Sequence, residues 1–140
     1  MNKREMIVKV LKDMGLRPKV DSDGDVYVRY ELKTIVFQLS CEEENYMNIC
    51  LYGFRKVIES ERIVSMFICN AMNRALRLVN VFVDKDLKSV SAMYDFYFTD
   101  EDSLALNVKE CLELFGQLIN LYGKMKQDYI MENDVNEDEK

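Results

Sequence analysis

The chain has 140 residues, of which 49% are hydrophobic and 31% charged, with four cysteines and no histidine. These proportions are those of a folded protein, and the length fits a single domain. The net charge of −6 carries no basic excess of the kind that binds nucleic acids, and the lack of histidine and of paired cysteines argues against a metal site such as zinc.

A helix is predicted at the start of the chain. Asn2 and Glu5 have the spacing of an N-cap and its capping-box partner, and apolar residues then recur at helical spacing as far as Met14. Gly15 supplies a C-terminal stop, and Pro18 cannot continue the helix.

Residues 21–25, Asp-Ser-Asp-Gly-Asp, share part of the pattern of a calcium-binding loop. Such a loop needs glycine at its sixth position and glutamate at its twelfth, whereas here Gly24 is fourth and Leu32 is twelfth. The segment therefore predicts a turn with Gly24 at positive φ, and no calcium site.

Three strands with period-two alternation follow, joined at Lys33 and Thr34 and by the acidic residues 41–45. Their inward residues are Val26, Val28, Tyr30 and Leu32, then Ile35, Phe37 and Leu39, then Met47, Ile49 and Leu51. Short polar joints between alternating segments are typical of an antiparallel meander.

Ser60 is the expected N-cap of a second helix, and strands follow at Val79–Val83 and 90–98. The inner face expected for this helix consists of Val64, Phe67, Ile68, Ala71 and Ala75. Thr99 and Asp102 then begin a long third helix, whose end beyond Tyr122 is expected to overhang. Its apolar stripe consists of Leu104, Val108, Cys111, Phe115, Leu118, Tyr122, Met125 and Tyr129.

The predicted order is α-βββ-α-ββ-α, an α+β fold in which an antiparallel five-stranded sheet packs with three helices. Residues 1–131 are expected to form one domain, and residues 132–140, with five acidic residues against one lysine, an acidic disordered tail. Cys50, Cys69 and Cys111 lie among apolar neighbours and are expected to be buried, reduced thiols.

The protein is expected to be cytoplasmic and without a membrane segment. Its uninterrupted apolar stretches are a few residues long, whereas a membrane-spanning helix needs roughly 20. The first five residues do not lead into the apolar core of a signal peptide.

No catalytic residue and no cofactor site are predicted. Without histidine, a serine or cysteine nucleophile would need lysine or a carboxylate as its base, and no motif places one. The five glycines are scattered, so no phosphate-binding loop is expected. The acidic runs 42–44 and 100–102 are interpreted as a solvated loop and a helix start, which leaves a carboxylate-dependent enzyme as the weakest alternative.

The second helix has a polar face with Asn70 on it and Arg74 at its flank. Arg62, Asn73 and Arg77 on this face are candidate ligand-binding residues for an anion or an acidic peptide. The ordinary interpretation is a solvated face whose asparagines bond to nearby backbone.

The second face of the predicted sheet is unusually apolar. It carries Tyr27, Val36, Tyr46, Tyr52, Phe82, Met93 and Tyr97, mixed with Arg29, Gln38, Asn48, Asp84 and Asp95. A face left to water should be more uniformly polar, so one of the protein's own helices, a second subunit or a client protein is expected to cover it. The candidate protein-binding residues are Tyr27, Tyr46, Tyr52, Phe82 and Met93.

Several residues together carry a family resemblance that spans nearly the whole chain except the acidic tail. They are the opening Asn2-Lys3-Arg4-Glu5, Met14-Gly15-Leu16, Pro18, Asp23-Gly24-Asp25, Ser60-Glu61, Asn70, Asn73, Arg74, Arg77, the Val79–Val83 strand and the long helix from Asp100. The chain resembles the YbjN-like proteins, which share the fold of the type III secretion chaperones. The resemblance implies an antiparallel α+β fold, frequent dimerisation and no established activity, and it offers no functional residue to carry over.

The leading hypothesis is a non-enzymatic cytoplasmic protein, a homodimer, that binds a segment of a client or regulatory partner. The secretion chaperones bind extended segments of their clients, which the resemblance extends to this chain as an expectation. The alternative is a small sensor of an anionic ligand that uses the polar face of the second helix.

Overall fold

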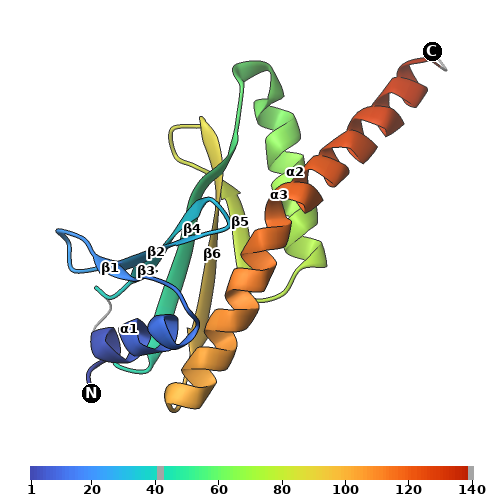
Figure 1. The fold of residues 1–140 in the computed structure, drawn as a ribbon. Coiled ribbons are helices and arrows are strands. Elements are labelled where there is room, and N and C mark those ends of the chain that lie inside the picture. Colours follow the sequence, from blue (N-terminus) through green and yellow to red (C-terminus); the bar gives the residue numbers. More distant parts are fainter. Residues whose placement is uncertain (41–42, 139–140) are drawn as a thin grey trace.

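The computed structural model describes residues 1–40 and 43–138, with side chains as far as residue 133 (Figure 1). This part of the chain contains three helices, α1 (Lys3–Asp13), α2 (Arg62–Ala75) and α3 (Glu101–Asp138), with a 3-10 turn, η1 (Glu59–Glu61), before α2. The strands are β1 (Lys19–Val20), β2 (Val26–Tyr30), β3 (Lys33–Gln38), β4 (Tyr46–Lys56), β5 (Val79–Val83) and β6 (Ser89–Tyr97). They form one antiparallel sheet in the order β1-β2-β3-β4-β6-β5.

The predicted α+β class and element order are confirmed, and the predicted count of five strands is wrong by one. The additional strand, β1, consists of Lys19 and Val20, which are both exposed and pair with Tyr27 and Val26 of β2. Two residues are too few to show an alternation in the sequence.

The start of α1 and the turn after it agree with the prediction. The side-chain oxygen of Asn2 accepts a hydrogen bond from the backbone N–H of Glu5 at 2.8 Å. In the turn, the Asp21 carboxylate accepts the backbone N–H groups of Asp23 and Asp25, and Gly24 has a φ of 85°. These hydrogen bonds close the turn, and the prediction of positive φ at Gly24 is confirmed.

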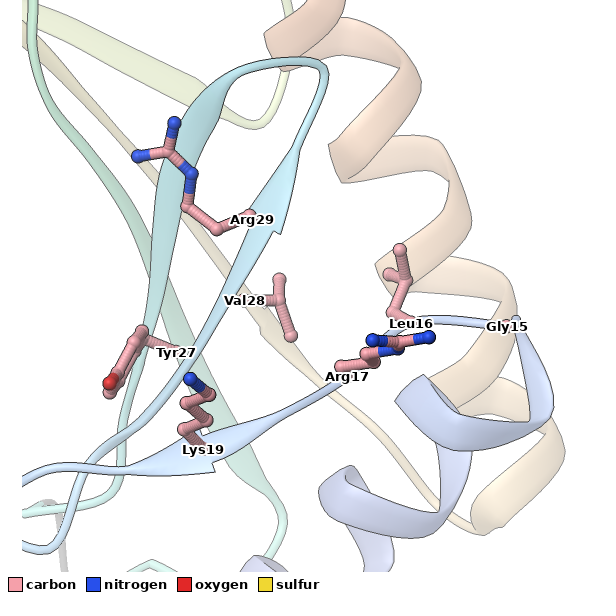
Figure 2. A pocket seen from close by; sticks show the side chains of 7 residues that line it. All are labelled: Gly15, Leu16, Arg17, Lys19, Tyr27, Val28 and Arg29. Atoms are coloured by element: carbon pink, nitrogen blue, oxygen red, sulfur yellow. The ribbon is translucent and has the colours of Figure 1, made fainter.

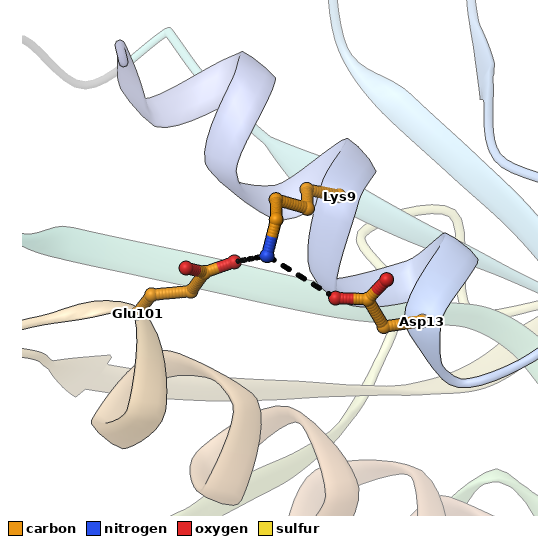
Figure 3. Close-up of polar contacts among 3 residues, drawn as sticks. All are labelled: Lys9, Asp13 and Glu101. Carbon is orange, nitrogen blue, oxygen red and sulfur yellow. Dashed lines mark hydrogen bonds and ion pairs between the residues drawn. The ribbon is translucent and has the colours of Figure 1, made fainter.

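An ion-pair cluster connects α1 to the start of α3 (Figure 3). The Nζ of Lys9 lies 2.5 Å from Oε1 of Glu101 and 3.3 Å from Oδ2 of Asp13. Hydrogen bonds to Glu101 and then to Asp13 raise the pKa of Lys9. All three groups are solvent-accessible, so the cluster contributes little to the stability of the fold.

The β2–β3 connection corrects a predicted boundary. Leu32 was expected to point inward and the joint to lie at Lys33 and Thr34, but Leu32 is 91% exposed and the turn consists of Glu31 and Leu32. Both turn residues have positive φ, 48° and 67°. Asparagine and glycine usually mark such turns, and their absence here concealed the turn in the sequence.

One face of the sheet carries the core. Two rows of directly paired residues cross five strands on this face, each at most 8% exposed: Val28, Ile35, Leu51, Ala92 and Val81, and Val26, Phe37, Ile49, Tyr94 and Val79. α1 contacts β2, α3 contacts β4 and β6, and α2 contacts β5. The buried residues of the three helices join these rows in a single cluster, so all three helices cover the same face.

The second helix differs from its prediction in start and in phase. It begins at Arg62, because Ser60 lies in η1, and no side chain caps it. Its buried residues are Ser65, Ile68, Cys69 and Met72. Phe67 and Ala75, expected inside, are exposed. The Tyr122 hydroxyl of α3 donates a hydrogen bond to the buried Ser65 hydroxyl, which helps to set this phase.

The predicted stripe of α3 is confirmed as far as Tyr122, and its last two residues, Met125 and Tyr129, are half-buried. Buried on it are Leu104, Val108, Cys111, Phe115, Leu118 and Tyr122. The Asp100 carboxylate, not Thr99, accepts the N–H of Ser103 at the helix start. The last turns project away from the sheet (Figure 1). α3 runs to Asp138 and so includes most of the segment 132–140. Residues 139–140 lie outside the described residues. The disorder expected for this tail stays a prediction. No described helix is long and apolar enough to cross a membrane.

Candidate functional site

The second face of the sheet, here called the open face, is the candidate site, because none of the three helices packs on it. A row of directly paired apolar residues crosses this face. The row ends at β6, and the residue paired with it on the next strand, β5, is the polar Asn80. From β2 to β6 the row consists of Tyr27, Val36, Cys50 and Met93. Directly paired side chains lie within contact distance, so the row is continuous.

A polar row separates this apolar row from an aromatic pair. Gln38, Asn48 and Asp95 are paired across β3, β4 and β6, and the Asn48 amide donates a hydrogen bond to the Asp95 carboxylate. Beyond them Tyr46 faces Tyr97, with ring centroids 5.2 Å apart. The open face is therefore two apolar areas divided by a hydrogen-bonded polar strip.

Tyr52 is the most exposed of the five predicted contact residues, at 47%. Its hydroxyl accepts a hydrogen bond from the amide of Gln38, so the ring reaches back along β4 over Cys50. Burial raises the pKa of the Tyr52 hydroxyl, and the hydrogen bond to Cys50 adds to the shift. Cys50 itself is fully buried although it belongs to the open face. The Tyr52 ring thus covers the thiol.

Phe82 lies at the far side of the open face, opposite Ser91 of β6. The Ser91 hydroxyl donates to the Asp84 carboxylate at 2.8 Å and accepts the backbone N–H of Gly53. Gly53 lies in the segment of β4 where its register with β6 shifts. The hydrogen bonds of Ser91 therefore connect the end of β5, which carries Phe82, to β4 at its β-bulge.

A cavity of about 380 Å³ opens beside Tyr52. It lies where β4 runs on past the end of its pairing with β3. Its apolar lining consists of Leu32, Val36, Leu51, Tyr52, Phe54 and Ile119. The cavity lies where Val36 and Tyr52 of the open face meet Leu51 of the core row and Ile119 of α3, with Lys33 and Thr34 also in its lining, and it is large enough for a side chain.

The structure brings the predicted contact residues together only in part. Tyr27 and Met93 share the apolar row, and Tyr52 reaches over the Cys50 between them. Phe82 is offset towards β5, and Tyr46 lies beyond the polar strip. Cys50 was missed as a member of this face, although its place between the inward Ile49 and Leu51 would have revealed it.

The predicted anion-binding residues do not converge. Arg62 and Asn73 lie eleven positions apart on α2, which separates them by about 16 Å along the helix axis. The Asn73 amide donates to the carbonyl of Val81 and accepts its N–H, at 2.9 and 2.8 Å, so it closes the outer edge of β5. Arg77 follows the end of α2 and is exposed. Their role as ligand residues stays a prediction.

The described residues offer no assembled catalytic or metal centre. No group of three or more histidine, cysteine or acidic side chains that could hold a metal ion occurs among them. Cys50, Cys69 and Cys111 are buried and unpaired as predicted, and Cys41 lies outside the described residues. Burial raises the pKa of all three thiols, that of Cys69 to about 11, so they stay protonated at neutral pH and are poor nucleophiles.

Solved structures confirm the fold. YbjN from E. coli superimposes with a TM-score of 0.67 at 14% identity, over 88% of this chain and 92% of that one. An uncharacterized protein from Methanothermobacter thermautotrophicus gives 0.59 at 14%, over 90% and 98%. The Yersinia pestis type III secretion chaperone SycH, solved with a stable fragment of YscM2, gives 0.56 at 12%, over 85% and 98%.

At these identities the three structures show a shared fold and nothing about activity. No curated protein matches the sequence. The family described as "Putative bacterial sensory transduction regulator" matches residues 3–124, which takes in every strand and helix up to the middle of α3. The chain belongs to the YbjN family.

Proposed function

We propose that this chain is a non-enzymatic, cytoplasmic protein-binding module, chaperone-like or regulatory, that binds a segment of a partner protein on its open face. One observation carries the proposal. The apolar row of Tyr27, Val36, Cys50 and Met93 is continuous across four strands, yet the chain's own helices all pack on the opposite face. A contiguous apolar patch rimmed by polar residues is typical of an interaction surface.

The local geometry supports the same proposal. Tyr52 stands beside the cavity of about 380 Å³, so a partner side chain seated there would contact both the phenol ring and the apolar lining. Interfaces gain most of their affinity from a few such aromatic anchors at pockets. The likeness to SycH, which was solved with a fragment of another protein, is in keeping with this use of the fold.

The proposal includes a homodimer, since a second copy could cover part of the open face. Light scattering over a concentration series tests this part. We expect twice the chain mass at every concentration above the dissociation constant. A constant single-chain mass would contradict the homodimer and leave the whole face to another protein.

The binding site itself is tested by replacement of Tyr52 and Phe82 with serine. The double variant should lose the partners that the unchanged protein captures from a lysate of its source organism. The matched control replaces Ile63 and Met66, which are 69% and 49% exposed on α2, with serine and should retain them. Equal capture by the two double variants would place the site elsewhere.

A further inference from the structure

The outer edge of β2 is only partly paired. β1 pairs with Val26 and Tyr27 and reaches no further, whereas β2 continues to Tyr30. In the part of the chain that the structure describes, no strand lies against residues 28–30 on that side. An unpaired strand edge presents N–H and C=O groups that another chain can join.

Hairpin geometry identifies the exposed groups. Tyr30 and Lys33 flank the two-residue turn, and such a flanking pair exchanges both of its backbone hydrogen bonds. Bonded and outward-facing residues alternate along a strand, so Val28 also faces β3, and Arg29 presents its N–H and C=O to the open edge.

A cavity of about 330 Å³ lies at this edge, between β2 and the segment that leads from α1 into β1. Its lining includes three cations, Arg17, Lys19 and Arg29, and no carboxylate. None of the ion pairs among the described residues involves these cations. Arg29 donates hydrogen bonds to Thr34 and to the carbonyl of Leu32, which orient its guanidinium without neutralising it.

The three cations do not meet at one point. Figure 2 shows Tyr27 and Arg29 on one side of β2, with Val28 and Leu16 on the other, and Arg17 well separated from Arg29. A small anion could not contact all three. An added strand sends alternate side chains to both sides, so it could place carboxylates beside each cation.

We propose that the outer edge of β2 takes an extended acidic segment of a partner protein, which pairs with the backbone of Arg29 and is held by Arg17, Lys19 and Arg29. Charge complementarity selects the occupant, because the lining is purely cationic among its charged residues. The site goes beyond the proposed function, since it uses the backbone edge of β2 and the cations beside it, and Tyr27 is the residue of the open-face row that also lines this cavity. Tyr52 and Phe82 do not line it, so either site can fail without the other.

The test uses a fluorescein-labelled peptide that repeats Glu-Glu-Val-Val, which places carboxylates on both sides of an added strand, and binding to the full chain is read by anisotropy. Replacement of Arg17 and Lys19 with glutamine should weaken binding roughly tenfold, as expected for two lost charge contacts. Replacement of the exposed Arg74 and Arg77 with glutamine should leave affinity unchanged, and so should the Tyr52 and Phe82 double variant. A peptide with glutamine in place of glutamate should bind weakly.

Strand pairing is tested separately. A peptide with proline in place of valine keeps its charges but cannot pair, so it should not bind, and NMR should show slower exchange of the Arg29 amide only with the valine peptide. No binding of the valine peptide would overturn the proposal. So would equal binding of the proline peptide, full competition by free glutamate or inorganic phosphate at equal concentration, or equal weakening in the Arg74 and Arg77 control.

Discussion

The two faces of the sheet are built from the same strands and differ in every alternate residue. On the face under the helices, paired positions such as Phe37 and Ile49 are fully buried and apolar. On the open face, Tyr52 and Tyr97 stay 47% and 63% exposed and lie among polar residues. Burial explains the first set of residues. The second gains little from folding alone, which is why we propose a binding role for it.

The largest effect is expected where this comparison is sharpest, at adjacent residues of β3. Replacement of the buried Phe37 with alanine should lower the free energy of unfolding by about 3–5 kcal/mol, because it leaves a cavity under the helices. Replacement of Val36, its neighbour on the open face, with alanine should lower the free energy of unfolding by about 1 kcal/mol or less. Urea denaturation measures both. Similar losses would mean that the open face is also part of the core.

A smaller loss is expected at the edge of β5. Replacement of Asn73 with alanine removes both of its bonds to the Val81 backbone and should cost about 1–2 kcal/mol. Asn70, exposed on the same helix, serves as the control and should change stability by less than about 0.5 kcal/mol. If the urea unfolding midpoint of the Asn73 variant is unchanged, water replaces the two hydrogen bonds of the amide without loss of stability.

A variant of Tyr52 tests whether this side chain shields Cys50 from solvent while contributing little to the stability of the fold. Its replacement with serine should cost about 1 kcal/mol or less, yet it should uncover the Cys50 thiol. Mass spectrometry after treatment with a thiol reagent should then find Cys50 modified faster than in the unchanged protein. Cys111, buried on the inner side of α3, serves as the internal control and should stay unmodified in both. Equal protection of Cys50 would show that Tyr52 does not cover it.

The last effect, which is absent at neutral pH, is a pH dependence on the helix-covered side. Burial raises the pKa of Cys69 from 9.0 to about 11, so the unfolded thiol releases its proton first as the pH rises. The contribution is fully present below pH 9 and is lost progressively towards pH 11. Urea midpoints between pH 8 and pH 11 should decline less steeply when Cys69 is alanine. Identical slopes would contradict a buried, protonated thiol.

Periodicity predicted the features that periodic burial determines. The alternation of Val26 and Val28 and the stripe from Leu104 to Tyr122 follow directly from one-sided burial, and both are confirmed. The phase of α2 was not predictable, because long-range polar contacts, such as Ser65 with Tyr122, help to set it. The alternation also placed aromatic residues on the second face, but it carries no information on which face the helices would cover.

The central claim, that the open face binds protein, is tested most directly by photo-crosslinking. A photoreactive phenylalanine at position 52 is compared with the same residue at position 106, where Leu106 is 58% exposed on α3. On irradiation in a lysate of the source organism, position 52 should give a discrete adduct with a partner polypeptide or a second copy, and position 106 should give none. No adduct at position 52, or the same adduct at both positions, would contradict the claim.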